Sequence, residues 1–183
     1  MRTVLIAVLT IAAAAVGAGG WLAAGGFDVA ADSPHSPLVF RAIEFARDRG
    51  VEARAEKIAV PALDDPKLLA KGAKDYVAMC EGCHLGPGVA DNEFRKGVYP
   101  QPPDLFKNPT DSDAEAFWVI KHGLKMTAMP AWGLTHDDAT LWGIVAFLKQ
   151  LPTLTPAQYQ QVTASAAEAH HEEESHADHE AAH

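Results

Sequence analysis

The sequence predicts an all-α protein, in which one helical domain follows an apolar N-terminal transmembrane helix and precedes a disordered tail. Residues 3–27 carry no charge, and three later segments place apolar residues at helical spacing between residues that start and stop helices. No segment shows the alternation typical of a strand, and no internal repeat is present. The expected division is an anchor or signal segment at 1–27, a linker with a juxtamembrane helix at 28–60, a core domain at 61–153 and a tail at 154–183.

The N-terminal segment is long enough to span a membrane as a helix. Spanning takes about 20 mostly apolar residues, whereas the apolar part of a secretory signal is about 7–15 residues long. The length of the run and Trp21 near its outer end favour a retained single-pass anchor in the inner membrane. A cleaved signal stays open, because residues 16–18 and 29–31 each suit signal peptidase. Arg2 keeps the N-terminus inside, which places the rest of the chain in the periplasm.

A juxtamembrane helix is expected over residues 38–57. One face carries a narrow apolar stripe, and another carries acidic residues at every fourth position, namely Glu44, Asp48, Glu52 and Glu56. Like charges at this spacing repel mildly, and Gly50 weakens the middle of the helix. The helix reads either as a solvated spacer that holds the core domain off the membrane or as a docking surface for a partner subunit; a charge run favours the spacer.

Three core helices have recognisable starts. Residues 64–66 read Asp-Asp-Pro, an aspartate cap followed by proline in the first turn. Residues 112–115 read Ser-Asp-Ala-Glu, a capping box. The last core helix is capped within 135–138 and stops at Pro152. Between the first two helices, residues 85–110 are rich in glycine and proline and predict a loop.

Residues 80–84 read Cys-Glu-Gly-Cys-His, the C-x-x-C-H signature of covalent haem attachment. Cys80 and Cys83 can each bond a vinyl group of one porphyrin, and His84 then lies under the iron as its proximal ligand. The chain has no other cysteine, so the motif allows one haem c and no disulfide. A zinc site would need a second Cys/His pair, and a thioredoxin-like pair would follow a strand; neither is found in the sequence. A haem also supplies apolar surface for the long loop at 85–110.

The ligand on the opposite face of the iron decides between electron transfer and catalysis. The candidates are Met126, Met129, His122 and His136. A thioether is a soft, neutral ligand that raises the reduction potential, and Pro130 stiffens the loop that presents Met129. Met126 is expected in the last turn of the preceding helix as core packing. We expect His122 to be a surface or packing residue and His136 to form a turn at a helix start.

The core resembles class I c-type cytochromes over residues 61–152. The resemblance rests on three landmarks in order: the C-x-x-C-H at 80–84, Pro-Pro-Asp-Leu at 102–105, and Met-Pro-Ala-Trp-Gly at 129–133. It is closest to membrane-anchored, single-haem bacterial cytochromes grouped with the third subunit of certain haem–copper oxidases. The resemblance implies the class I cytochrome c fold and Met129 as axial ligand. It also implies a proline carbonyl, at 102 or 103, that accepts the second N–H of His84.

The resemblance further implies a non-enzymatic electron carrier, tethered to the inner membrane and serving redox donor and acceptor proteins. A haem c subunit of a larger membrane oxidase or dehydrogenase is the alternative. A catalytic or gas-sensing haem would require that Met129 does not ligate the iron. On the first core helix, Gly72 and Tyr76 resemble the positions that cross the last helix near Trp142 and Val145, so a Gly72→Val change should impair folding.

The charge is concentrated in the tail. Six acids in residues 168–183 account for much of the net charge of −9, and the other residues hold 18 acids against 15 bases, which gives no basic excess for nucleic acid. The tail's five histidines predict weak divalent-metal binding; they are His170, His171, His176, His179 and His183. Six basic residues either steer an acidic partner to the haem edge or merely aid solubility; they are Lys71, Lys74, Arg95, Lys96, Lys121 and Lys125.

Overall fold

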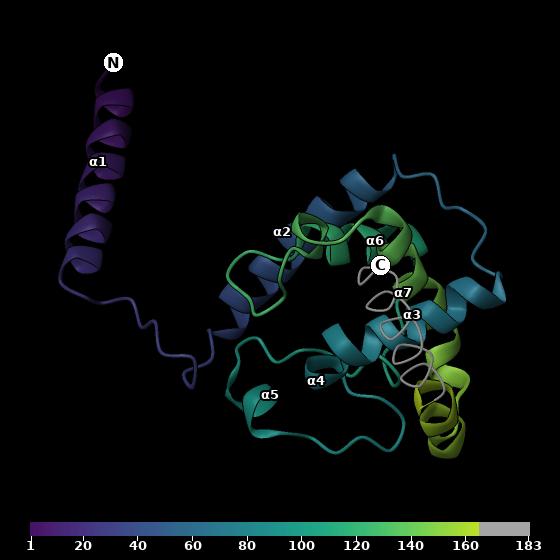
Figure 1. Ribbon diagram of the computed structural model, residues 1–183. Helices are drawn as coiled ribbons and strands as arrows, with labels where there is room; N and C mark the ends of the chain where they lie inside the picture. Colours follow the sequence, from purple (N-terminus) through teal and green to yellow (C-terminus); the bar gives the residue numbers. More distant parts are fainter. Residues whose placement is uncertain (165–183) are drawn as a thin grey trace, which may run out of the picture. The chain divides into compact units, whose positions relative to one another are not determined.

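The computed structural model describes residues 1–164, in which every regular element is a helix and no strand is present (Figure 1). This confirms the predicted fold class. The chain divides into two compact units, residues 1–34 and the part that begins at His35. The second unit contains, in chain order, α2 (Pro37–Ala55), α3 (Pro66–Met79), α4 (Glu81–His84), α5 (Glu93–Gly97), α6 (Asp113–His122), η1 (Trp132–Leu134), α7 (Asp138–Gln150) and η2 (Leu151–Thr153). Residues 156–164 are also helical.

The first unit is built around α1 (Arg2–Ala23), which has 22 residues and no buried side chain. Its length and apolar composition suffice to cross a membrane, although a signal sequence meets the same criterion. The helix covers most of the uncharged run.

Local capping signals place the core helices where the sequence predicts them. Asp65 accepts a hydrogen bond from the Lys67 N–H at 2.9 Å, with Pro66 in the first turn of α3. Ser112 accepts the N–H of Glu115 at the start of α6, and the residue before α7 caps that helix in the same way. Each cap satisfies a backbone N–H that the first helical turn leaves without a partner.

α3 lies across α7, and two glycines allow the close crossing (Figure 1). A Cβ on Gly72 would stand only 1.9 Å from the carbonyl oxygen of Gly143. Tyr76, one turn further along α3, is completely buried and its hydroxyl donates to the carbonyl of Leu85 at 2.6 Å. The expected role of Gly72 in this crossing is therefore confirmed, and Gly143 is its counterpart on α7.

α2 packs on the core domain through its C-terminal half. Val51 and Ala55 are 7% and 3% exposed, and α2 lies against α6. The Arg54 guanidinium lies 5.9 Å from the centre of the Trp118 ring of α6. The solvated-spacer interpretation is wrong for this half of the helix, because its apolar residues on one face pack against a neighbouring helix.

The core extends to Tyr159, beyond residue 153 where the haem domain was expected to end. Tyr159 is 2% exposed, and its ring centre lies 6.3 Å from that of Phe147 on α7. The five tail histidines lie outside the described residues. Within residues 1–164, no group of three or more His, Cys, Asp or Glu side chains is placed to hold a metal ion.

Candidate haem-binding site

A sharp turn gathers the three residues of the attachment motif. α3 ends at Met79, Cys80 leaves the helical conformation at φ −120°, and α4 begins at Glu81. The carbonyl of Cys80 then accepts the N–H groups of Cys83 (3.0 Å) and His84 (2.8 Å). Neither thiol forms a disulfide; Cys80 is buried and Cys83 is half-buried. Both thiols and the imidazole are thus held on one helical turn.

The imidazole of His84 is held by the loop that follows. Its Nδ1 lies 2.9 Å from the carbonyl oxygen of Pro103, so Nδ1 carries the hydrogen and donates it. The Leu105 N–H donates to the carbonyl of His84 at 3.2 Å. Of the two prolines that the sequence left open, the structure therefore selects Pro103. Among the described residues no hydrogen bond reaches the Nε2 of His84, which leaves this nitrogen available as a ligand.

Burial keeps this imidazole neutral. Desolvation lowers the pKa of His84 below its ordinary value, and the positive charge of Arg95 acts in the same direction. The hydrogen bond to Pro103 opposes them without reversing the shift. The neutral ring is the form that can ligate a metal ion.

The thiol of Cys80 is unlike that of a disulfide oxidoreductase. Burial raises its pKa to about 12, and the nearby Asp75 and Cys83 add to the effect. Reactive C-x-x-C cysteines have a pKa below the ordinary value, because the thiolate is the nucleophile. The structure therefore disfavours a thioredoxin-like role for the pair and is consistent with a cysteine used for attachment.

Met129 lies in a loop with its own internal hydrogen bonds. Gly123 ends α6 with φ 64°, and the Leu124 N–H donates to the carbonyl of Met129 at 3.2 Å. The N–H of Met129 donates to the Thr127 hydroxyl at 3.1 Å. The Met129 side chain is partly buried and packs against the same hydrophobic cluster that contains Cys80.

The other ligand candidates are at the surface or in turns. Met126 is 93% exposed with φ 58°, so its expected place in a helix and in the core is wrong, because α6 already ends at His122. His122 is exposed, and its ring centre lies 4.9 Å from that of Trp118. His136 forms a hydrogen bond of 2.9 Å through Nδ1 with the Thr135 hydroxyl just before α7, as expected for a turn residue.

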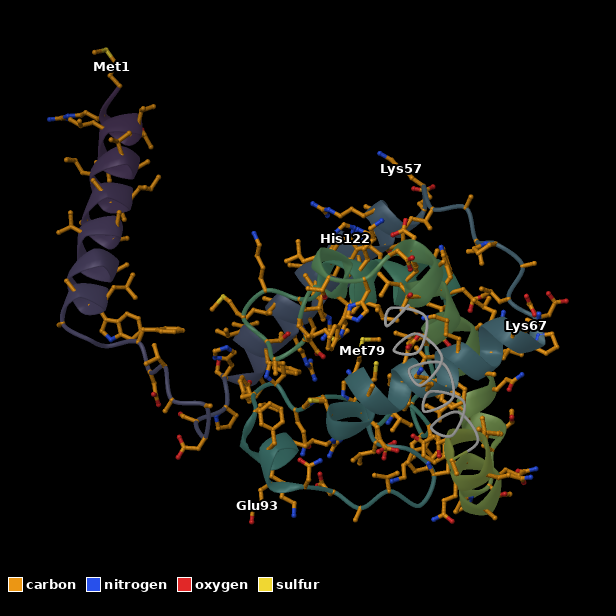
Figure 2. All side chains as sticks on the ribbon, viewed as in Figure 1. Met1, Lys57, Lys67, Met79, Glu93 and His122 are labelled. Atoms are coloured by element: carbon orange, nitrogen blue, oxygen red, sulfur yellow. The ribbon has the colours of Figure 1, made fainter. Side chains whose placement is uncertain are left out.

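Several partly buried apolar side chains line the core cluster that contains Cys80, as a covalent haem would need. The partly buried ones that pack on the core cluster include Met79, Val89, Leu105, Phe106, Met129 and Trp132. In Figure 2 the half-buried Met79 is drawn near the middle of the second unit, whereas the exposed Lys57, Lys67 and Glu93 lie at its periphery. Two free thiols and an imidazole with an open Nε2 on one turn are the groups that attach and ligate a c-type haem, and the partly buried thioether of Met129 is of the kind that ligates haem iron.

A separate hollow of about 410 Å³ lies between the end of α2, α6 and α7. Its lining includes Arg54, Trp118, His122 and Trp142. None of the four predicted haem ligands lines it, so this hollow does not define the haem site.

Two functional neighbours of the motif were not anticipated. Arg95, expected among the surface cations, is 8% exposed and donates to the carbonyls of Cys83 and Pro102. Tyr159, expected in the tail, donates its hydroxyl hydrogen to Glu81 at 2.6 Å. The signals that could have revealed them are local: Asn92 is a good helix cap just before Arg95, and Pro156 is a good first-turn residue just before Tyr159.

Comparison with known proteins gives a match that covers this site. The family model described as cytochrome C oxidase, cbb3-type, subunit III matches residues 67–148, just under half of the chain. No curated protein and no solved structure matched. Domains of this family carry covalently bound haem c and exchange electrons with redox partners, and Cys80 and Cys83 stand at the C-x-x-C-H position. Residues 67–148 therefore form a class I c-type cytochrome domain, the haem-binding part of an electron-transfer protein.

Proposed function

We propose that the protein is a membrane-tethered, single-haem electron carrier of the periplasm, with no substrate of its own. Cys80 and Cys83 would attach the haem, and His84 and Met129 would be its axial ligands. The observation that carries this proposal is the contact of 2.9 Å between His84 Nδ1 and the Pro103 carbonyl, made inside a C-x-x-C-H turn. It orients the imidazole and leaves Nε2 as the ligand atom.

The bound haem supplies reversible one-electron chemistry, and the chain's residues set the conditions for it. The hydrogen bond to Pro103 fixes the tautomer and the ring orientation of His84. The hydrogen-bonded loop from Gly123 holds Met129 against the core cluster, which would limit rearrangement when the charge of the iron changes. A thioether ligand from Met129 would close the iron to small molecules and so favour electron transfer over catalysis.

The first unit supports a tether. α1 has the length and composition of a membrane span, and Arg2 at its start favours an N-terminus on the cytoplasmic side. Residues 24–36 then link α1 to α2. A tether of this kind would keep the haem domain close to membrane-bound redox partners.

The test is the mass and visible spectrum of the protein purified from native membranes. We expect a mass that includes one haem, and a ferric spectrum with the long-wavelength iron–thioether band. A mass without haem would contradict attachment at Cys80 and Cys83, and absence of the band would contradict ligation by Met129. The same mass reports whether the N-terminal segment is retained.

The family description favours a second candidate. It names a subunit of a cbb3-type oxidase, so this chain would serve as a haem c subunit of a larger oxidase or dehydrogenase. Extraction in mild detergent followed by native electrophoresis separates the two candidates. Stoichiometric partner subunits that stay with the haem band would favour the subunit; a haem band at the mass of the single chain would favour the carrier.

A further inference from the structure

Arg95 is a buried cation at the junction of the haem-attachment turn and the loop that follows it. It is 8% exposed and lies on the short helix α5. Its Nε donates to the carbonyl of Cys83 at 3.0 Å and its Nη2 to the carbonyl of Pro102 at 2.8 Å. Its Nη1 lies 3.2 Å from a carboxylate oxygen of Asp91, which balances the charge.

The two carbonyls that Arg95 binds flank the hydrogen bond of the imidazole. The carbonyl of Cys83 belongs to the peptide bond that leads into His84. The carbonyl of Pro102 belongs to the peptide bond that leads into Pro103, whose own carbonyl accepts the Nδ1 hydrogen of His84. One planar guanidinium therefore links the turn that carries His84, the hydrogen-bond donor, to the loop that carries Pro103, the acceptor.

A second contact fixes α5 to the same turn. Asn92 caps α5 by accepting the Arg95 N–H at 2.9 Å, and its amide donates to the carbonyl of Gly82 at 2.7 Å. The start of α5 is thus held to the attachment turn by Asn92, in addition to the contacts of the Arg95 guanidinium. The fork of a guanidinium can bind two carbonyls at a fixed spacing, which a lysine ammonium cannot do.

We propose that Arg95 is a positioning residue that keeps the hydrogen bond between His84 and Pro103 closed, and so fixes the orientation of the proximal imidazole. The inference rests on the proposed role of His84 as an iron ligand. Arg95 forms its hydrogen bonds with the two backbone segments that it joins and with Asp91, and not with the imidazole itself.

The experiment measures solvent exchange of the His84 Nδ1 hydrogen by NMR in the ferrous holoprotein. Arg95→Gln removes the charge and the fork, and Arg95→Lys removes only the fork. Lys96→Gln is the matched control, because Lys96 is an exposed cation on the same helix. We expect both Arg95 variants to raise the exchange rate at least tenfold, with no change in Lys96→Gln. The backbone amides of Tyr76 and Ile144 in the core should keep their wild-type rates.

Three results would overturn the inference. The first is an Nδ1 exchange rate that is unchanged in both variants. The second is an equal acceleration of exchange at the core amides, which would indicate a general loss of stability. The third is a wild-type Nδ1 exchange rate in Arg95→Lys but not in Arg95→Gln, which would assign the effect to charge. If neither variant folds, the wild-type protein decides: Nδ1 of His84 should exchange no faster than the Nε hydrogen of Arg95. The wild-type spectrum tests separately whether haem is attached and ligated. A failure of the proposed function can therefore be distinguished from a failure of the inference about Arg95.

Discussion

Met126 and Met129 stand three residues apart, yet they have opposite surroundings. Met126 is 93% exposed at a left-handed backbone position, whereas Met129 packs against the core cluster in a hydrogen-bonded loop. Both are candidate ligands in the sequence, which favours Met129 by its Met-Pro motif and predicts core packing for Met126. The structure leaves Met129 as the one of these two methionines that is partly buried, and this difference makes the pair a matched test of the axial ligand.

Replacing Met129 with alanine should remove the sixth ligand. We expect Met129→Ala to lose the ferric iron–thioether band, and the ratio of ferrous to ferric haem at a fixed ambient potential to fall at least tenfold, which is ~59 mV for a one-electron couple. Met126→Ala should leave the band and the ratio unchanged. Survival of the band in Met129→Ala would show that another residue ligates the iron. Visible spectroscopy during a redox titration makes both measurements.

The crossing of α3 and α7 is asymmetric, although a glycine stands on each helix. A Cβ on Gly72 would meet the carbonyl of Gly143 at 1.9 Å, inside any acceptable contact. A Cβ on Gly143 would meet the carbonyl of Leu68 at 3.4 Å and the Cα of Gly72 at 3.5 Å, which are ordinary contacts. The two glycines should therefore respond differently to the same substitution.

We expect Gly72→Ala to destabilise the protein by about 3 kcal/mol, because the helices must separate. Gly72→Val should cost more. Gly143→Ala should be neutral or stabilise by up to ~1 kcal/mol, since alanine is the better helix former. Urea unfolding of the holoprotein, followed by circular dichroism, gives the three values. Equal losses in both alanine variants would contradict the asymmetry.

The helices were predictable because their signals are local. Asp65 with Pro66 starts α3 and Ser112 starts α6, each through a contact within three residues in the chain. The C-x-x-C-H turn is local in the same sense, so its cofactor could be inferred from sequence. The short helix α5 was missed inside the loop at 85–110, because five residues hold too little periodicity to be recognised.

Two other errors concern contacts between separate segments. Arg95 reads as a surface cation in sequence, and only the folded loop brings the carbonyls of Cys83 and Pro102 to it. Val51 sits in a charged helix whose acidic repeat suggests solvation, yet it packs toward α6. The charge pattern of a helix indicates which of its residues prefer water. Which face becomes buried depends also on the helix that packs against it, and the spacing of residues within one helix does not identify that neighbour.

At the scale of the whole molecule, the helical residues 156–164 pack against the attachment turn through Tyr159. The ring of Tyr159 lies over Gly86, where a Cβ would approach its Cζ to 2.5 Å, and the hydroxyl donates to Glu81 within the motif. Burial, followed by the hydrogen bond and charge of Glu81, raises the pKa of Tyr159 above its ordinary value. Burial likewise raises the pKa of Tyr76.

These shifts predict a loss of stability in alkali. Above pH ~10 the tyrosines of the unfolded chain release protons that the folded protein retains, so the free energy of unfolding falls as pH rises. Tyr159→Phe should destabilise the protein by about 1.5–3 kcal/mol at neutral pH, because a hydrogen bond to a carboxylate is lost. Above pH ~10 the free energy of unfolding of Tyr159→Phe should fall less steeply with pH than that of the wild-type protein. The difference corresponds to one proton, about 1.4 kcal/mol per pH unit. Urea midpoints from neutral to alkaline pH measure both effects, and parallel curves for the two proteins would contradict the assignment.

The predicted haem ligands all belong to the unit that begins at His35, whereas the candidate membrane helix belongs to the other. Attachment to the membrane and ligation of the haem should therefore be separable. If α1 is retained, high salt will not release the native protein, detergent will, and its N-terminal peptide will begin at Met1 or Arg2. Replacing residues 1–27 with a cleavable export signal should then yield a soluble protein with an unchanged ferric spectrum, because Met129 and His84 keep their surroundings.

A native protein that is soluble and begins after residue 18 or 31 would instead identify the segment as a signal. A soluble variant without the thioether band would show that the haem site depends on the anchor.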